Sequence, residues 1–199
     1  MSNIISSDWL NRSVLEVAPD LLGCTLVRQL ADGQILRGQI VEVEAYQAGD
    51  PACHGYRKKT DRNAMMFSAA GVAYVYLIYG LYHCLNIVTD REAFASAVLI
   101  RALQLESYPT ERLPPKQKFD RLAAGPGKLC QVLEIDRRLN GCQLEPGQGL
   151  WLEARSPQWQ QDCDRGAIAI TQTSRIGITQ GVDLLWRWYL QDCAAVSRR

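Results

Sequence analysis

Apolar and polar residues alternate along several short stretches in the first half of the chain, a spacing typical of half-buried β-strands. Four of these stretches form two pairs, at residues 25–30 and 35–46 and at residues 72–78 and 82–88. The first pair is joined through Asp32-Gly33, and Asp-Gly between two β-rich stretches is a strong hairpin signal. The second pair turns at Tyr79-Gly80. With a further strand at residues 97–103, the pattern predicts a mainly antiparallel sheet rather than repeated βαβ units.

Short helices are predicted on either side of these strands. Scattered apolar positions between residues 8 and 22 predict one or two helices broken near Pro19, with Gly23 as the stop. Residues 127–133 predict another short helix. The prolines within residues 107–118 predict an exposed loop.

The C-terminal part returns to strand composition, at residues 167–170 and 186–190. No stretch resembles an interdomain linker, and 199 residues is about the length of one domain. We therefore expect a mixed α/β (α+β) fold in a single domain over residues 1–199, with residues 1–7 flexible.

Composition narrows the class of protein. Hydrophobic residues make up 47% of the chain and charged residues 22%, which is ordinary for a globular protein and argues against disorder. No apolar run approaches the roughly 18 residues of a membrane helix, and no export signal is visible at the N-terminus. The seven cysteines form no Cys-x-x-Cys pair, so reduced thiols are expected. The expected location is the cytoplasm, associated with the nucleoid, for a bacterial chain and the nucleus for a eukaryotic one.

The net charge of +1 does not point to a partner, but two segments are locally basic. Residues 54–63 carry four basic side chains against one acidic, and residues 101–128 carry six against three. These segments are either solvated faces or a surface that meets phosphates. The candidate phosphate contacts are Arg57, Lys58, Lys59, Arg62 and Lys128.

Alternation along the strand at residues 35–46 sorts its side chains into two faces. One face holds Val41, Val43 and Ala45, and the other holds Ile40, Glu42, Glu44 and Tyr46. Two carboxylates and a tyrosine therefore share one side, while the aliphatic residues face a core. A solvent-facing side of a sheet would show the same pattern, and this alternative stays open.

Tyr79 stands at the predicted tip of the second hairpin, followed by Gly80, which accepts a positive φ. An exposed aromatic ring gives up hydrophobic burial, so a protruding ring usually has something to insert into. The alternative is that the ring folds back over the sheet edge.

Several spaced motifs, taken together and in order, resemble the alkyladenine (3-methyladenine) DNA glycosylase family. The resemblance extends over residues 21–178. The matching segments are VEVEAY at 41–46, DPACH at 50–54, YVYLIYG at 74–80, CLN at 84–86, VLIRAL at 98–103, GPGKLC at 125–130 and RIG at 175–177.

The resemblance implies a curved antiparallel sheet flanked by helices, and hydrolysis of the N-glycosidic bond of damaged purines flipped out of duplex DNA. It implies that Glu44 is the general base, that Tyr79 is the wedge that fills the gap in the DNA, and that the other matching residues form the base pocket. That pocket would consist of the stacking residues Tyr46, His54 and Tyr76, of Asn86, which would exclude guanine, and of Arg101 near the DNA backbone. The expected partner is duplex DNA with damaged purines, bound by a monomer without metal or cofactor.

The chemistry of the residues agrees with these roles. Glycosidic hydrolysis normally needs two carboxyl groups, of which one protonates the leaving group. A purine alkylated at N3 or N7 already carries positive charge, so one carboxylate, Glu44, suffices to take a proton from water. A cationic base between aromatic faces also gains cation–π attraction. Because no amine nucleophile is positioned by the motifs, water attack without a lyase step is expected.

Each of these residues also has a purely structural interpretation. Glu44 could be a buried structural carboxylate, His54 a structural histidine, and Asn86 the donor of a strand-edge hydrogen bond. Arg101 and Lys128 could be ordinary surface charges.

Two other classes of protein remain possible from the residues. One is a protein that binds damaged DNA without turnover. The other is a metal hydrolase using His54, His83 and some cysteines, although these lack the close ligand pairs of zinc sites. The stretch at residues 125–128 lacks the full spacing of a phosphate-binding loop. Residues 184–195 depart from the family pattern, which puts the pairing of the last strand in doubt.

Overall fold

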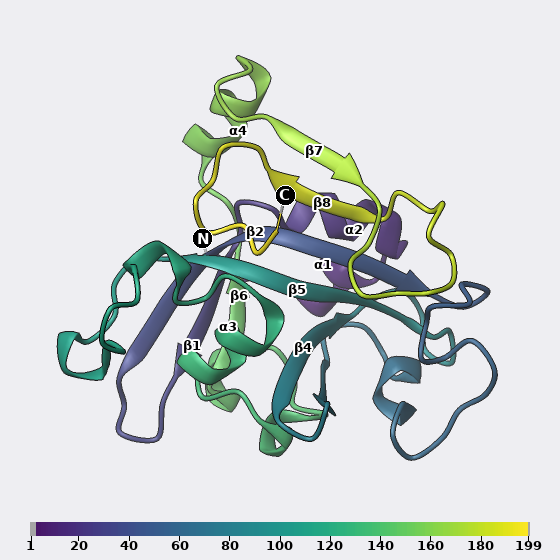
Figure 1. The fold of residues 1–199 in the computed structure, drawn as a ribbon. Helices are drawn as coiled ribbons and strands as arrows, with labels where there is room; N and C mark the ends of the chain where they lie inside the picture. The colour runs from purple at the N-terminus through teal and green to yellow at the C-terminus, as the bar shows by residue number, and fades with distance from the viewer. Residues whose placement is uncertain (1–2, 199) are drawn as a thin grey trace.

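In the computed structural model, which describes residues 3–198, the alternating stretches become strands of one sheet (Figure 1). The strands are β1 Thr25–Gln29, β2 Ile35–Gln47, β3 Ala73–Ile78, β4 Tyr82–Val88, β5 Ser96–Leu105, β6 Leu150–Glu153, β7 Ile170–Thr173 and β8 Arg187–Leu190. The helices are α1 Ser7–Leu10, α2 Val14–Leu21, α3 Pro126–Val132 and α4 Pro157–Asp164. Short 3₁₀ turns lie at Ala64–Phe67, Thr110–Arg112, Phe119–Arg121, Arg137–Leu139 and Pro146–Gln148.

The long strand β2 is the centre of the sheet. Along the path β3-β4-β5-β2-β1-β6 every recorded strand pair is antiparallel. One edge of β2 pairs with β5. The other edge pairs with β1 up to Gln39 and then with β8 from Glu42 to Glu44, and β7 pairs with β8 in turn. The predicted antiparallel α+β domain is confirmed, and the last strand has a definite partner on the central strand.

Alternation along β2 decides which layer each side chain enters. Val41, Val43 and Ala45 are fully buried in the main core with α2 residues such as Val17 and Leu21. Figure 1 shows α1 and α2 behind the sheet and α3 in front of it. The opposite face of β2, with its carboxylates and tyrosine, therefore lies on the side of α3.

The helix break predicted near Pro19 is wrong in position. Pro19 lies inside α2, in its last turn, where the missing N–H removes one hydrogen bond without ending the helix. The break falls instead between α1 and α2, where the Ser13 side chain caps α2 by accepting a hydrogen bond from the Leu15 N–H at 3.4 Å.

In the C-terminal part, the strand predicted at residues 186–190 is confirmed as β8, but the one predicted at 167–170 begins only at Ile170. The backbone N–H groups of Ala167 and Ile168 donate to the carbonyl of Asp162 at the end of α4, so these residues terminate a helix. Helix α4 itself was missed. Its signal was Ser156 followed by Pro157, because Ser156 caps the helix through the Trp159 N–H at 3.2 Å.

Of the segment expected to be flexible, residues 1 and 2 lie outside the described residues. The following residues run beside β6, where Ile4 bridges to Glu153 and the Ile5 N–H donates to the Leu152 carbonyl at 2.9 Å. Ile5 is buried. Within residues 3–198, no helix has the length and apolar character needed to cross a membrane.

Candidate active site

A cavity of about 480 Å³ opens between β2, the β3–β4 hairpin and the loop that follows β7. Its volume lies within the roughly 300–1,000 Å³ typical of small-molecule sites. Six residues predicted to contact DNA line it: Tyr46, His54, Tyr76, Tyr79, Asn86 and Arg101. The structure thus brings together residues from β2, β3, β4, β5 and two loops.

Glu44 lies behind the wall of this cavity and is fully buried. Its Oε2 accepts hydrogen bonds from the Tyr46 hydroxyl at 2.8 Å and from Arg101 Nη1 at 3.2 Å. Its Oε1 accepts one from the backbone N–H of Ile176 at 2.7 Å. All three donors belong to residues that line the cavity. A carboxylate held only by donors therefore lies one layer behind a hollow that could receive a base.

The face of β2 that carries Glu44 is not exposed to solvent, so that alternative is wrong. Glu42 and Glu44 are both 0% exposed. Strand β8 pairs beside them, and Arg187 on β8 donates through Nε to Glu42 at 2.8 Å. The alternation itself is confirmed, but the polar face is covered by arginines rather than by water.

Arg101 reaches both carboxylates because the strand pairing is irregular at this point. The register passes from Glu42 opposite Ala102 to Val43 opposite Ile100, so Arg101 has no partner on β2. Bulges of this kind re-aim side chains and are common beside active sites. Arg101 Nε donates to Glu42 at 3.0 Å while Nη1 donates to Glu44. It is 7% exposed, so it is not an ordinary surface charge.

Three aromatic rings form one wall of the cavity. The His54 ring contacts Tyr76 edge-on at a centroid distance of 4.6 Å, and Tyr76 lies 5.4 Å from Tyr74. His54 Nδ1 lies 2.9 Å from the Tyr74 hydroxyl. Desolvation by these neighbours lowers the pKa of His54 below its usual value near 6.5, and the charge of Arg62 lowers it further. Both causes favour the neutral form of His54.

Asn86 makes the cross-strand hydrogen bond of its structural interpretation and also lines the cavity. It is buried, and its Nδ2 donates to the Tyr74 carbonyl at 3.1 Å across the β3–β4 ladder. The same side chain lines the cavity. The cross-strand hydrogen bond thus holds a polar group at a fixed place in the wall.

Comparison with known proteins decides the family. A profile of the methylpurine-DNA glycosylase family matches residues 8–194. The chain belongs to this family. A relative from Trichodesmium erythraeum is 56% identical over 203 residues, covering 99% of this chain and 98% of the relative. Relatives from Synechococcus sp. (57% identical; 96% of this chain, 97% of the relative) and Synechococcus elongatus (50%; 98% and 93%) are also similar, and all three carry 3-methyladenine DNA glycosylase as a provisional name.

As a methylpurine-DNA glycosylase, the protein is a hydrolase of base excision repair that acts on alkylated bases in DNA. One ion pair of this glycosylase was not anticipated. Asp50 and Arg175 are both buried and pair through two contacts, Arg175 Nη1 with Oδ2 and Nη2 with Oδ1, the second at 2.9 Å. The family motifs at 50–54 and 175–177 contain its two partners, but neither motif indicated that they pair.

Arg175 joins several parts of the cavity wall. It donates to the Ala45 carbonyl at 3.0 Å and to the Gly181 carbonyl at 3.3 Å, and its guanidinium lies 4.6 Å from the centre of the Tyr46 ring. Residues 176–180, which follow it, line the cavity. The Asp50–Arg175 pair therefore ties β2 to the loop that supplies the Ile176 contact of Glu44.

Tyr79 protrudes from the hairpin of the glycosylase and does not fold back. It is 82% exposed, and its φ of 53° together with the φ of 68° at Gly80 gives the left-handed turn expected between twisted strands. Leu81, two residues further on, is 73% exposed. Because a positive φ is unfavourable for a tyrosine, the turn holds an exposed ring at some expense of stability.

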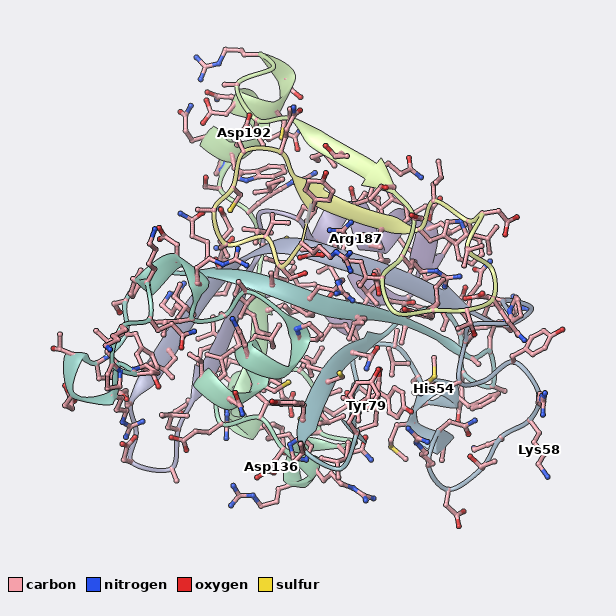
Figure 2. All side chains as sticks on the ribbon, viewed as in Figure 1. His54, Lys58, Tyr79, Asp136, Arg187 and Asp192 are labelled. Carbon is pink, nitrogen blue, oxygen red and sulfur yellow. The ribbon has the colours of Figure 1, made fainter. Side chains whose placement is uncertain are left out.

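The basic loop, residues 54–63, lies beside this cavity. Arg57, Lys58 and Arg62 line a second hollow of about 370 Å³, which shares His54 with the cavity. Figure 2 shows Lys58 at the outer end of this loop and His54 between it and the hairpin of Tyr79. Lys59 is exposed in the same loop, and its Nζ lies 5.8 Å from the Phe67 ring.

Lys128 is placed differently from the other predicted phosphate contacts. It is exposed on α3 and lines a separate hollow of about 210 Å³ with Tyr108 and Gln117. Pro126, two residues earlier, does line the cavity of about 480 Å³. Lys128 therefore does not gather with the basic loop.

No group of three or more His, Cys, Asp and Glu side chains in the described part of the chain is placed to hold a metal ion. The seven cysteines are free thiols.

Proposed function

We propose that the protein is a monofunctional glycosylase that hydrolyses the N-glycosidic bond of alkylated or deaminated purines flipped out of duplex DNA, with water activated by Glu44. The observation that carries this proposal is the buried Glu44 carboxylate, held by Tyr46, Arg101 and Ile176 directly behind a cavity lined by those three residues. The provisional names of the relatives support 3-methyladenine as a substrate.

In the proposed reaction, the bond between the anomeric carbon of deoxyribose and the purine nitrogen breaks, and its electron pair leaves with the base. Water oxygen forms the new bond to that carbon, and Glu44 takes the proton released by the water. A base alkylated at N3 or N7 leaves as a neutral molecule, because the electron pair cancels its positive charge. A deaminated purine such as hypoxanthine leaves as an anion and takes up a proton from solvent water. The products are a free base and an intact abasic strand.

In this proposal, the contacts of Glu44 leave one acceptor position for the water. An ionised carboxylate offers about four acceptor positions. Oε2 accepts two hydrogen bonds and Oε1 accepts one, so the remaining position is on Oε1, beside the Ile176 N–H. Since Glu44 is covered in the free protein, we infer that a bound lesion brings the water to this oxygen.

The walls of the cavity suit a planar, electron-poor base. We propose that the base stacks between Tyr46 on one side and the His54–Tyr76 pair on the other, where a cationic base gains about 0.5–2 kcal/mol of cation–π attraction. A neutral His54 adds no repelling charge at neutral pH. Asn86, fixed by its bond to Tyr74, would leave the exocyclic amine of guanine clashing or unpaired.

DNA is contacted, in this proposal, by two exposed features beside the cavity. Tyr79 fills the gap left by the flipped nucleotide, which offsets part of the few kcal/mol that flipping requires. Arg57, Lys58, Lys59 and Arg62 meet phosphates. Because one chain supplies all the walls of the cavity, we propose that it acts as a monomer, and in the cytoplasm if the source is bacterial.

The decisive test is Glu44→Gln, measured by single-turnover release of 3-methyladenine or hypoxanthine from a defined duplex. We expect the variant to bind lesion DNA as the wild type does and to release base about 10²–10⁴-fold more slowly. Glu153→Gln is the matched control, because Glu153 pairs with Arg37 on the far side of the sheet order. Undiminished release by Glu44→Gln would refute the assigned role. If the wild-type protein itself bound lesion DNA but released no base, the protein would be a lesion binder rather than an enzyme. Borohydride trapping of a covalent adduct would contradict water attack.

A further inference from the structure

Glu42 is the second carboxylate on the cavity face of β2, and the reaction described above makes no use of it. It is fully buried and accepts three hydrogen bonds. The donors are Arg101 Nε at 3.0 Å, Arg187 Nε at 2.8 Å and the backbone N–H of Ser197 at 2.7 Å. A buried carboxylate with three donors is firmly held in one orientation.

Arg101 connects Glu42 to the proposed general base. Its Nε donates to Glu42 and its Nη1 donates to Glu44. Since the guanidinium group is planar and rigid, fixing the Nε edge also fixes the direction of Nη1. Arg101 depends on this contact for its orientation, because it occupies the bulge and has no opposing residue on β2.

The C-terminal segment holds Glu42 from the other side. Arg187 also donates through Nη2 to the Arg198 carbonyl. Arg121 binds the same segment, through Nη1 to the Val196 carbonyl at 2.6 Å and through Nη2 to the Ser197 carbonyl at 3.1 Å. These contacts place the Ser197 N–H against Glu42, so the end of the chain reaches the centre of the sheet.

We infer that Glu42 is a positioning residue for base excision: it orients Arg101 toward Glu44, and the C-terminal segment holds Glu42 in place. The inference rests on the proposed function of Glu44. A purely structural Glu42–Arg187 pair would not need Arg101, whose other end reaches Glu44. Two carboxylates and two arginines also balance in charge: Arg101 pairs with both carboxylates and Arg187 pairs with Glu42, so no charge in the cluster is left unpaired.

A double-mutant cycle tests this inference. Single-turnover release is measured for the wild type, Glu42→Gln, Arg101→Gln and the double variant, with affinity for lesion DNA measured alongside. We expect Glu42→Gln to slow release about 10–100-fold with little change in affinity, as misdirected catalytic groups do. In the Arg101→Gln background, Glu42→Gln should slow release no more than about twofold further, since the group it orients is absent. Glu153→Gln, measured in both backgrounds, should leave the rate unchanged.

The outcomes separate this inference from the proposed function. If Glu42→Gln reduced the release rate by the same factor in the wild-type and Arg101→Gln backgrounds, Glu42 would have a general structural role and the inference would be overturned. If Glu42→Gln released base at the wild-type rate while Glu44→Gln was inactive, the inference would be overturned but the proposed function of Glu44 would stand. If Glu42→Gln does not fold, Glu42→Asp keeps the charge and shortens the side chain. Made in the wild-type background, Glu42→Asp should also slow release, whereas made in the Arg101→Gln background it should not. An unchanged release rate in the wild-type background would reject the inference.

Discussion

The buried centre of the sheet and the exposed tip of the β3–β4 hairpin serve the same cavity but are built in opposite ways. In the centre, Glu42, Glu44 and Arg101 are at most 7% exposed, and each bonds an oppositely charged neighbour on another strand. At the tip, Tyr79 is 82% exposed and has an unfavourable positive φ. The difference indicates that the proposed general base lies on paired strands, where geometry is fixed, whereas the residue proposed to enter DNA lies on a turn with few contacts to lose.

The largest effect on the free energy of unfolding is expected in the buried region, from Asp50→Asn. This change leaves the Arg175 guanidinium buried without its counter-charge, which should lower the free energy of unfolding by about 3–5 kcal/mol. Denaturant unfolding of the purified protein measures it. Asp136→Asn is the matched control, because its partner Arg138 is exposed, and only a small change is expected there. If the two variants were equally stable, the buried pair would not be what ties the cavity walls together.

A smaller effect, of opposite sign, is expected at the hairpin tip. Tyr79→Gly removes a side chain from a left-handed position, so the protein should become about 0.5–1 kcal/mol more stable. Tyr79→Ala removes the same ring but keeps a residue that disfavours positive φ, so no such gain is expected.

Both Tyr79 variants should slow single-turnover release from duplex DNA by at least about tenfold, since neither can fill the gap left by a flipped base. Thermal or denaturant unfolding and release assays, run on the same samples, separate the two effects. Release at the wild-type rate by both variants would show that the exposed ring is not a wedge. A glycine variant less stable than the alanine variant would show that the turn is not strained.

The same contrast explains how much the sequence could predict. Hairpin turns and strand faces depend on neighbouring residues, so the pairing of β1 with β2 and of β3 with β4, and the exposure of Tyr79, followed from local patterns. The family resemblance named the residues that the structure gathers around the cavity. Their roles in catalysis stay predictions.

The buried centre could not be predicted, because its partners are distant in sequence. Alternation along β2 shows that Glu42 and Glu44 share a face, but not what covers that face. Arg187 bonds Glu42 from 145 residues away, and Arg175 pairs with Asp50 from 125 residues away. The skipped pairing at Arg101 depends on the packing of two strands and leaves no local pattern.

The smallest effect is a pH dependence that distinguishes the cavity wall from the hairpin tip. The folded protein holds the pKa of His54 below the value near 6.5 expected for the unfolded chain, first because the wall desolvates the ring and second because Arg62 is nearby. The unfolded state therefore binds the proton more readily. His54 contributes its full stability above about pH 6.5, and the contribution decreases as the pH falls toward the folded pKa.

We therefore expect the stability difference between the wild type and His54→Gln to decrease from pH 7.5 to pH 5.5, when free energies of unfolding are measured at each pH. The difference between the wild type and Tyr79→Ala serves as the reference and should stay constant over the same range. A difference for His54→Gln that is equally independent of pH would show that the wall does not disfavour the charged ring. In that case the wall would not keep His54 uncharged, and the stacking proposed for this wall would have to rest on Tyr46 and Tyr76 alone.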